Sequence, residues 1–232
     1  MVILKTVVNW QNTTIKKRDL LRDKRVNKVV AGLNGMNLDY DYLFKLVVLG
    51  EPRVGKTSLI LRYLKNIFSA GEYAQTLGAN FLVKRLTVSL SMDSHSGDEN
   101  LPEQRVLLQI WDLAGHMRHT QVKEHFYQGA AGCLLVYDVT DKASYDNLEL
   151  WHSDIKKRAP NARIAVLANK VDLCNGAQEV ERVLNDLTRI AEVFGAEFKF
   201  RTSAKTGNNV EKAFTQLTTN LVSNSETRSH KV

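Results

Sequence analysis

A glycine-containing segment near the start of the main apolar pattern has the residues needed to hold phosphate. Residues 50–57 read GEPRVGKT, which is GxxxxGK[ST] between an apolar run and a stretch of helical period. The glycines let such a loop curl until its backbone N–H groups face phosphate oxygens, and the following helix N-terminus adds partial positive charge. Lys56 supplies a full charge to the β- and γ-phosphates, and the Thr57 hydroxyl is a ligand for Mg²⁺. The segment therefore predicts a magnesium–nucleoside triphosphate site.

Two later segments indicate which base is recognised. Asn169-Lys170-Val171-Asp172 follows a short apolar run, and Ser203-Ala204-Lys205 follows another. The Asp172 carboxylate can accept from both N1–H and the 2-amino group of guanine. Adenine lacks this pair of donors and would leave the acceptor unpaired. A backbone N–H of the later segment can donate to guanine O6, so the three segments together predict a guanine nucleotide.

These segments need a scaffold in which loops follow strands. From Leu43 onward short apolar runs alternate with stretches of helical period. The strands expected are 43–49, 81–90, 105–111, 134–137, 164–167 and 198–200, and the helices expected are 56–67, 144–158, 178–194 and 209–222. Residues 91–104 are polar and acidic and are expected to form a hairpin loop. The alternation predicts an α/β fold with a six-stranded, mostly parallel sheet and helices on both faces.

Further segments, in a fixed order, carry a resemblance to a known family. They are residues 77–81 (LGANF), 111–116 (WDLAGH), 126–130 (FYQGA), 135–140 (LVYDVT) and 209–214 (NVEKAF). Together with the phosphate and base segments they resemble the Ras-like small GTPases, most closely the Rab branch, over about residues 43–222. The resemblance implies a Ras-like P-loop G domain that acts as a switch. In such a switch the γ-phosphate and its Mg²⁺ hold two loops in order until hydrolysis releases them.

The resemblance also implies roles for single residues. Thr76 should ligate Mg²⁺ and contact the γ-phosphate, Asp112 should hold Mg²⁺ through water, and the Gly115 N–H should contact the γ-phosphate. Phe68 resembles the aromatic that packs edge-on against guanine, although it lies one residue further from Thr76 than is usual. The expected nucleotide-binding residues are Gly50, Arg53, Val54, Gly55, Lys56, Thr57, Ser58, Phe68, Thr76, Gly115, Asn169, Lys170, Asp172, Leu173, Ser203, Ala204 and Lys205. The expected metal ligands are Thr57, Thr76 and Asp112, and the expected catalytic residues are His116, Lys56, Gly115 and Thr76.

His116 is the largest departure from the family pattern, which has glutamine there to orient the attacking water. Imidazole is rigid and shorter, with its donor and acceptor on opposite edges, so we expect slow intrinsic hydrolysis of GTP. Two alternatives stay open: His116 is tolerated while an activating protein sets the rate, or the chain is a constitutively GTP-bound interaction scaffold. His116, His119 and His125 could suggest a metal site, but no cysteine or carboxylate completes a convincing set of ligands, so zinc is not expected.

Charge and composition bound the remaining possibilities. The chain has 232 residues, net charge +7 and 44% apolar residues, which excludes wholesale disorder and a disulfide-stapled miniprotein. Residues 1–41 hold eight Lys/Arg and four Asp, so this basic extension carries +4 of the total. Its apolar residues recur loosely at helical spacing. A surface helix, a disordered extension, a basic helix that contacts an anionic membrane weakly, a partner-binding segment and an autoinhibitory segment all remain open.

The expected organisation is an N-terminal extension (1–41), a G domain (42–222) and a polar tail (223–232). Val2 and the final Ser-His-Lys-Val indicate neither a myristoyl nor a prenyl anchor. Nucleic acid is not an expected partner, because the extension has little beyond Trp10 and Tyr40 to stack on bases. We expect a monomer that meets effector proteins at switches I and II, an exchange factor and a GTPase-activating protein. Cytoplasmic localisation is expected, peripheral to membranes only through a partner or the extension.

Overall fold

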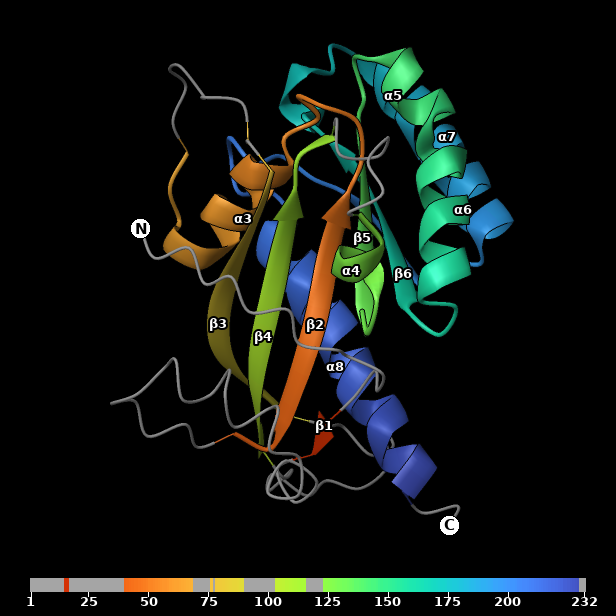
Figure 1. Ribbon diagram of the computed structural model, residues 1–232. Helices are drawn as coiled ribbons and strands as arrows, with labels where there is room; N and C mark the ends of the chain where they lie inside the picture. The colour runs from red at the N-terminus through yellow and green to blue at the C-terminus, as the bar shows by residue number, and fades with distance from the viewer. Residues whose placement is uncertain are drawn as a thin grey trace.

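A mixed sheet forms the centre of the molecule (Figure 1). The computed structural model describes residues 15–16, 40–68, 76, 78–89, 103–115 and 123–229. Six strands pair in the order β3-β4-β2-β5-β6-β7. Their bounds are β2 Tyr42–Leu49, β3 Ala79–Ser89, β4 Glu103–Leu113, β5 Gly132–Asp138, β6 Arg163–Asn169 and β7 Phe198–Arg201. All of these pairings are parallel except β3 with β4, which confirms the predicted six-stranded, mostly parallel sheet.

A short seventh strand, β1 (Ile15–Lys16), pairs antiparallel with the start of β2. The pairing of β2 with β5 begins only at Leu46, so β1 meets β2 at Tyr42 and Leu43, before that point. The helical pattern expected in the basic extension begins at Ile15, and the expectation is wrong there because Ile15 lies in a strand. The other apolar positions of that pattern lie outside the described residues.

Helices cover both faces of the sheet, as the sequence predicts (Figure 1). They are α3 Lys56–Lys65, α4 Lys123–Tyr127, α5 Lys142–Asp146, α6 Leu148–Arg158, η2 Val171–Leu173, α7 Ala177–Phe194 and α8 Val210–Ser229. Every residue of β2 is buried, and its alternate side chains enter two different cores. Phe44, Leu46 and Val48 pack with α3 and α8, whereas Val47 and Leu49 pack with α6 and α7.

Two helix boundaries differ from the sequence prediction. The stretch expected as one helix, 144–158, is divided at Asn147 into α5 and α6. The Leu150 N–H donates to Asn147 O, three residues back, which tightens the backbone locally as in a 3₁₀ turn. At the other end of the chain, α8 continues to Ser229, through most of the stretch expected as a polar tail. Tyr42 donates to Glu226 and Arg163 donates to Asn224, so contacts with the sheet hold this polar end of the helix.

The carboxyl ends of the parallel strands gather the loops that carry the candidate residues. β2 ends immediately before Gly50, β4 contains Asp112 near its end, and β6 ends at Asn169. Strands that run parallel have their carboxyl ends at one edge of the sheet, where α/β folds hold their ligands. No described helix is long and apolar enough to cross a membrane.

Candidate functional site

The loop between β2 and α3 has the tight curl that a phosphate cradle requires. Gly50, Arg53 and Gly55 all have positive φ, at 146°, 69° and 97°. A Cβ on Gly50 would lie 2.1 Å from the Val136 carbonyl oxygen, and one on Gly55 would lie 2.5 Å from Asn169 Nδ2. Both positions therefore need glycine for space as well as for conformation. Arg53 adopts the left-handed conformation without that freedom, and no contact of its side chain with the described residues explains it.

Lys56 lies inside the curl. Its Nζ donates to the carbonyl oxygens of Gly50 and Glu51, both at 2.8 Å, and the side chain is buried. Burial lowers the pKa of Lys56 to about 8, against the opposing effects of Asp112 and Glu51. The loop is tied to α6 by Trp151, whose Nε1–H donates to Glu51 Oε1 at 2.9 Å. The Lys56 ammonium therefore donates to neutral carbonyl oxygens in this structure. An anionic phosphate bound in the loop could replace these acceptors.

Three oxygen-bearing side chains from three segments meet beside Lys56. Thr57 Oγ1 donates to Asp112 Oδ2 at 2.6 Å and lies 2.7 Å from Thr76 Oγ1. Asp112 Oδ1 is buried and has no hydrogen-bond partner among the described residues. Burial raises the pKa of Asp112, while the Thr57 hydrogen bond and the charge of Lys56 lower it. A set of hydroxyl and carboxylate oxygens with one unsatisfied oxygen is chemically suited to Mg²⁺.

The predicted base segments lie against the phosphate loop. Asn169 Nδ2 donates to Val54 O at 2.8 Å, and its Oδ1 accepts from the Ala204 N–H at 3.3 Å. Asp172 Oδ1 accepts from Ser203 Oγ at 2.5 Å, and Lys205 Nζ lies 3.9 Å from Asp172 Oδ2. Asn169 therefore joins all three segments, from strands β2, β6 and β7, into one continuous structure.

Lys170 is positioned by Asp138, at the end of β5. Lys170 has φ of 67°, and its Nζ lies 2.6 Å from Asp138 Oδ2. The other carboxylate oxygen, Oδ1, accepts from the N–H and the hydroxyl of Thr140, and Ser144 Oγ accepts from the Asp138 N–H. The turn before α5 thus fixes the carboxylate so that one oxygen is left for Lys170.

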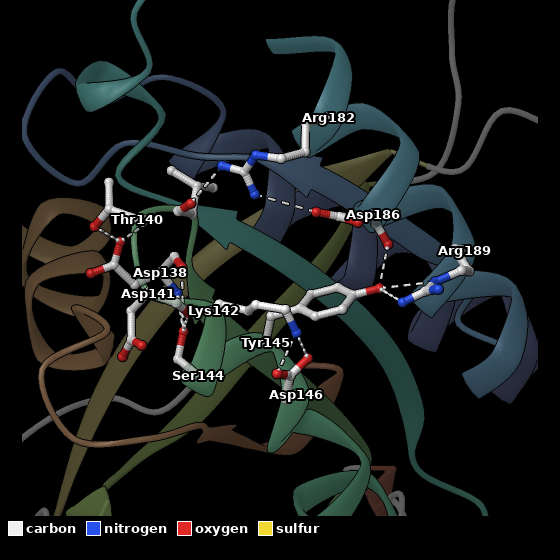
Figure 2. Close-up of polar contacts among 11 residues, drawn as sticks. Asp138, Thr140, Asp141, Lys142, Ser144, Tyr145, Asp146, Arg182, Asp186 and Arg189 are labelled. Carbon is white, nitrogen blue, oxygen red and sulfur yellow. Dashed lines mark hydrogen bonds and ion pairs between the residues drawn. The ribbon is translucent and has the colours of Figure 1, made fainter. Parts of the chain in front are cut away.

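The same turn is linked to α7 by a polar network (Figure 2). Arg182 donates to Val139 O, which directly follows Asp138. The Tyr145 hydroxyl donates to Asp186 O and accepts from Arg189. Figure 2 shows these side chains between α5 and α7, so two helices support the residue that holds Lys170.

Three other residues of the predicted site differ in how closely they approach the phosphate loop. Gly115 lies against the phosphate loop, because a Cβ there would be 2.3 Å from Pro52 N. Phe68 is half-buried against the core formed with α3 and α8, and Leu173 is exposed at the end of η2.

His116 and His119 lie outside the described residues. No group of three metal-binding His, Cys, Asp or Glu side chains occurs in the described part of the chain.

Sequence reasoning missed a row of aromatic rings beside the predicted metal ligands. Phe81 stacks on Trp111 with ring centroids 5.4 Å apart, and Trp111 packs against Phe126 at 5.5 Å. Phe81 is 38% exposed although it is large and apolar. The three residues come from β3, β4 and α4, and Trp111 directly precedes Asp112. The available signal was that Phe81 begins and Trp111 ends the two strands expected on either side of a hairpin loop, which places them opposite each other, as the observed pairing does.

Sequence reasoning also missed a buried lysine under α4. Lys45, on β2, is 4% exposed, and its Nζ donates to Gln128 O at 2.9 Å and His125 O at 3.4 Å. The ammonium also lies 4.9 Å from the centre of the Trp111 ring. Burial lowers the pKa of Lys45 to about 7. A lysine within an otherwise apolar strand was the available signal.

Known proteins match most of the chain. The model of the Ras family matches residues 45–223. A putative ras-related protein Rab-5B from Dictyostelium discoideum is 37% identical over 186 residues, which are 80% of this chain and 78% of the relative. Ras-related protein Rab-13 from Canis lupus familiaris is 34% identical over 79% of this chain and 82% of the relative. Ras-related protein Rab-26 from Bos taurus is 37% identical over 78% of this chain and 65% of the relative.

Proposed function

The chain belongs to the Ras family of small GTPases and is most similar to the Rab proteins, and we propose that it is a Mg²⁺-dependent GTP/GDP switch with slow intrinsic hydrolysis. The observation that carries the site assignment is the meeting of Thr57, Thr76 and Asp112 beside Lys56. Few structures other than a phosphate–metal site would gather an ammonium, two hydroxyls and a partly unsatisfied buried carboxylate at one end of a sheet.

We assign the phosphates to the curl of residues 50–57 and the metal to the three oxygen-bearing side chains. Bound Mg²⁺ supplies positive charge that neutralises the phosphate oxygens. With nucleotide and Mg²⁺ bound, Lys56 would exchange its carbonyl acceptors for phosphate oxygens, and Asp112 Oδ1 would be free to hold the metal directly or through water. The base then lies among Asn169, Asp172 and the loop of residues 203–205.

Removal of the Asp112 charge tests the metal assignment. In the wild-type protein Mg²⁺ should raise the affinity for GDP, and Asp112→Asn should reduce that effect by about tenfold. Asp146→Asn is a matched control, because Asp146 forms an exposed ion pair with Lys142 in the same helix. Calorimetric titration of GDP with and without Mg²⁺ measures both. An Asp112→Asn protein with the full Mg²⁺ effect would remove this metal assignment.

The switch itself follows from where Thr76 and Gly115 lie. Thr76 touches Thr57 through its hydroxyl, and Gly115 lies against Pro52 of the phosphate loop. Each therefore brings a separate segment to the phosphate and metal end of the site. A γ-phosphate gives both segments an extra anchor that GDP does not provide, so the two nucleotides favour different arrangements.

Slow hydrolysis rests on His116, which stands at the water-orienting position. Single-turnover hydrolysis of bound GTP should be at least about tenfold faster in His116→Gln than in the wild-type protein. The reason is that a side-chain amide can orient the attacking water for transfer of the γ-phosphate. Equal rates in the two proteins would show that His116 is tolerated. No detectable turnover in the wild type, together with bound GTP after purification, would instead support the constitutively GTP-bound scaffold.

A partner that reads the switch would find an aromatic surface next to it. The row of Phe81, Trp111 and Phe126 adjoins Asp112, and Phe81 exposes an apolar face. Exposed aromatics of this kind are typical anchors of protein interfaces. We propose that effectors bind there in the GTP state, and that an exchange factor and a GTPase-activating protein act on the same two segments.

Contact with membranes is proposed only through a partner or the basic extension. Each Lys or Arg near an anionic surface contributes about 1 kcal/mol, which the four Asp of the extension reduce. Sedimentation with anionic vesicles should recover more of the full chain than of a protein that lacks residues 1–41. Equal recovery of both would exclude the extension as a membrane contact.

A further inference from the structure

Arg62 connects two loops that the proposed function places around the base. It lies in the last turn of α3, and all three nitrogens of its guanidinium group donate hydrogen bonds. Nε donates to Ala204 O at 2.8 Å, and Nη2 donates to Lys205 O at 2.6 Å. Nη1 donates to the backbone oxygen of Asn66 at 3.1 Å and to its Oδ1 at 2.9 Å. One side chain thus holds both the loop of residues 203–205 and the end of α3.

The contact with Ala204 O controls the direction of a neighbouring donor. The carbonyl of Ala204 and the N–H of Lys205 belong to the same peptide unit. In a trans peptide these two groups point in opposite directions, and the described residues contain no cis bond. Arg62 holds the oxygen toward α3 and therefore turns the Lys205 N–H away from α3. The adjacent Ala204 N–H already faces Asn169.

The contact with Asn66 fixes the segment on the other side of the guanidinium, at the end of α3. Asn66 is the C-cap of α3 in the left-handed conformation, with φ of 53°, and its N–H donates to Arg62 O. Phe68, the aromatic expected against guanine, lies only two residues further along the chain. The guanidinium therefore sets the distance between the loop expected to read guanine O6 and the segment expected to carry the ring.

The planar fork of arginine is needed for this arrangement. Its acceptors are three backbone oxygens and one amide oxygen, and none of the four is a carboxylate. A lysine has one nitrogen and cannot reach acceptors on two loops with fixed geometry. Among the described residues no carboxylate pairs with Arg62. Its charge therefore polarises the Ala204–Lys205 peptide, which makes the N–H of that peptide a stronger donor.

We propose that Arg62 is a positioning residue for recognition of guanine O6. It fixes the direction of the Lys205 N–H and the position of the loop that carries the Ala204 N–H, without contacting the nucleotide. The inference rests on the proposed function, because it needs guanine nucleotide in this site. It differs from a general contribution to folding, since it concerns one edge of the base. Recognition of the 2-amino group through Asp172 should not depend on Arg62.

Three diphosphates separate these two edges of the base. GDP has O6, N1–H and the 2-amino group, and IDP lacks only the 2-amino group. The diphosphate of 2-aminopurine riboside keeps the 2-amino group but lacks O6 and N1–H; the N1–H lies opposite Asp172, so its loss costs the wild-type protein and the Arg62 variants equally. In Arg62→Gln the preference for GDP over the 2-aminopurine analogue should fall by about tenfold, the order expected for a charge-assisted hydrogen bond network. The preference for GDP over IDP should change by less than about twofold. Arg62→Lys should behave like Arg62→Gln, because it keeps the charge and loses the fork.

The control is Lys65→Gln, which removes one positive charge from the same turn of α3 at an exposed position. It should leave both preferences unchanged. An unchanged preference over the 2-aminopurine analogue in the Arg62 variants would overturn the proposal. An equal loss of both preferences, or failure of both Arg62 variants to fold, would assign Arg62 a structural role and overturn it too. A wild-type protein that binds none of the three diphosphates would instead refute the proposed function.

Discussion

Substitution of Gly115 by alanine should weaken binding of GTP much more than binding of GDP. A Cβ on Gly115 would lie 2.3 Å from Pro52 N, 2.5 Å from Pro52 Cδ and 2.8 Å from Glu51 C. Backbone and proline ring atoms cannot rotate aside. The two segments would have to separate by about 1 Å before the closest pair reached ordinary contact at 3.4 Å.

The size of the effect follows from this displacement. Forcing extra volume into a close contact costs about 1–3 kcal/mol, which corresponds to about a 5- to 150-fold change in an equilibrium constant. Under the proposed function, only GTP holds the Gly115 N–H to a γ-phosphate. The cost should therefore fall mainly on the affinity for a non-hydrolysable GTP analogue, by at least about fivefold. The affinity for GDP should change by less than about threefold, because that state does not need the approach.

Competition against a fluorescent GDP measures both affinities in the same protein. Gly195→Ala is the control, since Gly195 ends α7 with φ of 59° and a Cβ there meets nothing within 4 Å. It should lower stability by about 1 kcal/mol and leave nucleotide preference unchanged. If Gly115→Ala bound the GTP analogue and GDP with wild-type preference, the close approach to Pro52 would have no role in the switch.

Three further predictions concern titratable groups. Lys56 has a pKa of about 8 when no phosphate is bound, so its charged fraction falls from about nine-tenths at pH 7 to about one-tenth at pH 9, and affinity for GDP should fall about tenfold. Lys56→Arg stays charged and should lose less over the same range; parallel losses would contradict the assignment. Lys45 has a pKa of about 7, below the 10.5 of an ordinary lysine. The folded protein therefore binds fewer protons than the unfolded one between these values, and its free energy of unfolding should rise with pH from about 7 to about 10. Urea unfolding should show a smaller rise in Lys45→Met, and an identical rise would refute the burial argument. Asp172→Asn should shift base preference from guanine toward xanthine, which has a carbonyl in place of the 2-amino group. Competition of xanthosine diphosphate against GDP measures this preference. An unchanged preference in Asp172→Asn would show that Asp172 does not read the base.

The parts of the fold that the sequence predicts well are those with strong local signals. β2, the loop of residues 50–57 and α3 form a strand, a glycine turn and a helix, and each signal supports the next. β6 with the NKVD segment behaves in the same way. The segments predicted to bind the base and the phosphates lie against each other through Asn169, although the hydrogen bond from Asn169 to Val54 joins residues 115 positions apart.

Long-range contacts decide the features that the sequence does not predict. α8 continues past Val222 because Tyr42 and Arg163 hold its polar end, and neither partner is near it in sequence. Ile15 forms a strand because the start of β2 offers an edge there. Arg62 belongs to a regular helix pattern, and nothing local indicates that its guanidinium meets carbonyl groups 142 and 143 residues away.

The nucleotide content of the freshly purified protein tests the central claim most directly. The protein would be denatured, and the released nucleotide identified and quantified by ion-exchange chromatography. We predict stoichiometric guanine nucleotide, with a substantial share of GTP, because the proposed function assigns slow hydrolysis to a protein with His116 in place of glutamine. Protein that carries no guanine nucleotide, and that takes up neither GDP nor GTP in the presence of Mg²⁺, would contradict the proposed function.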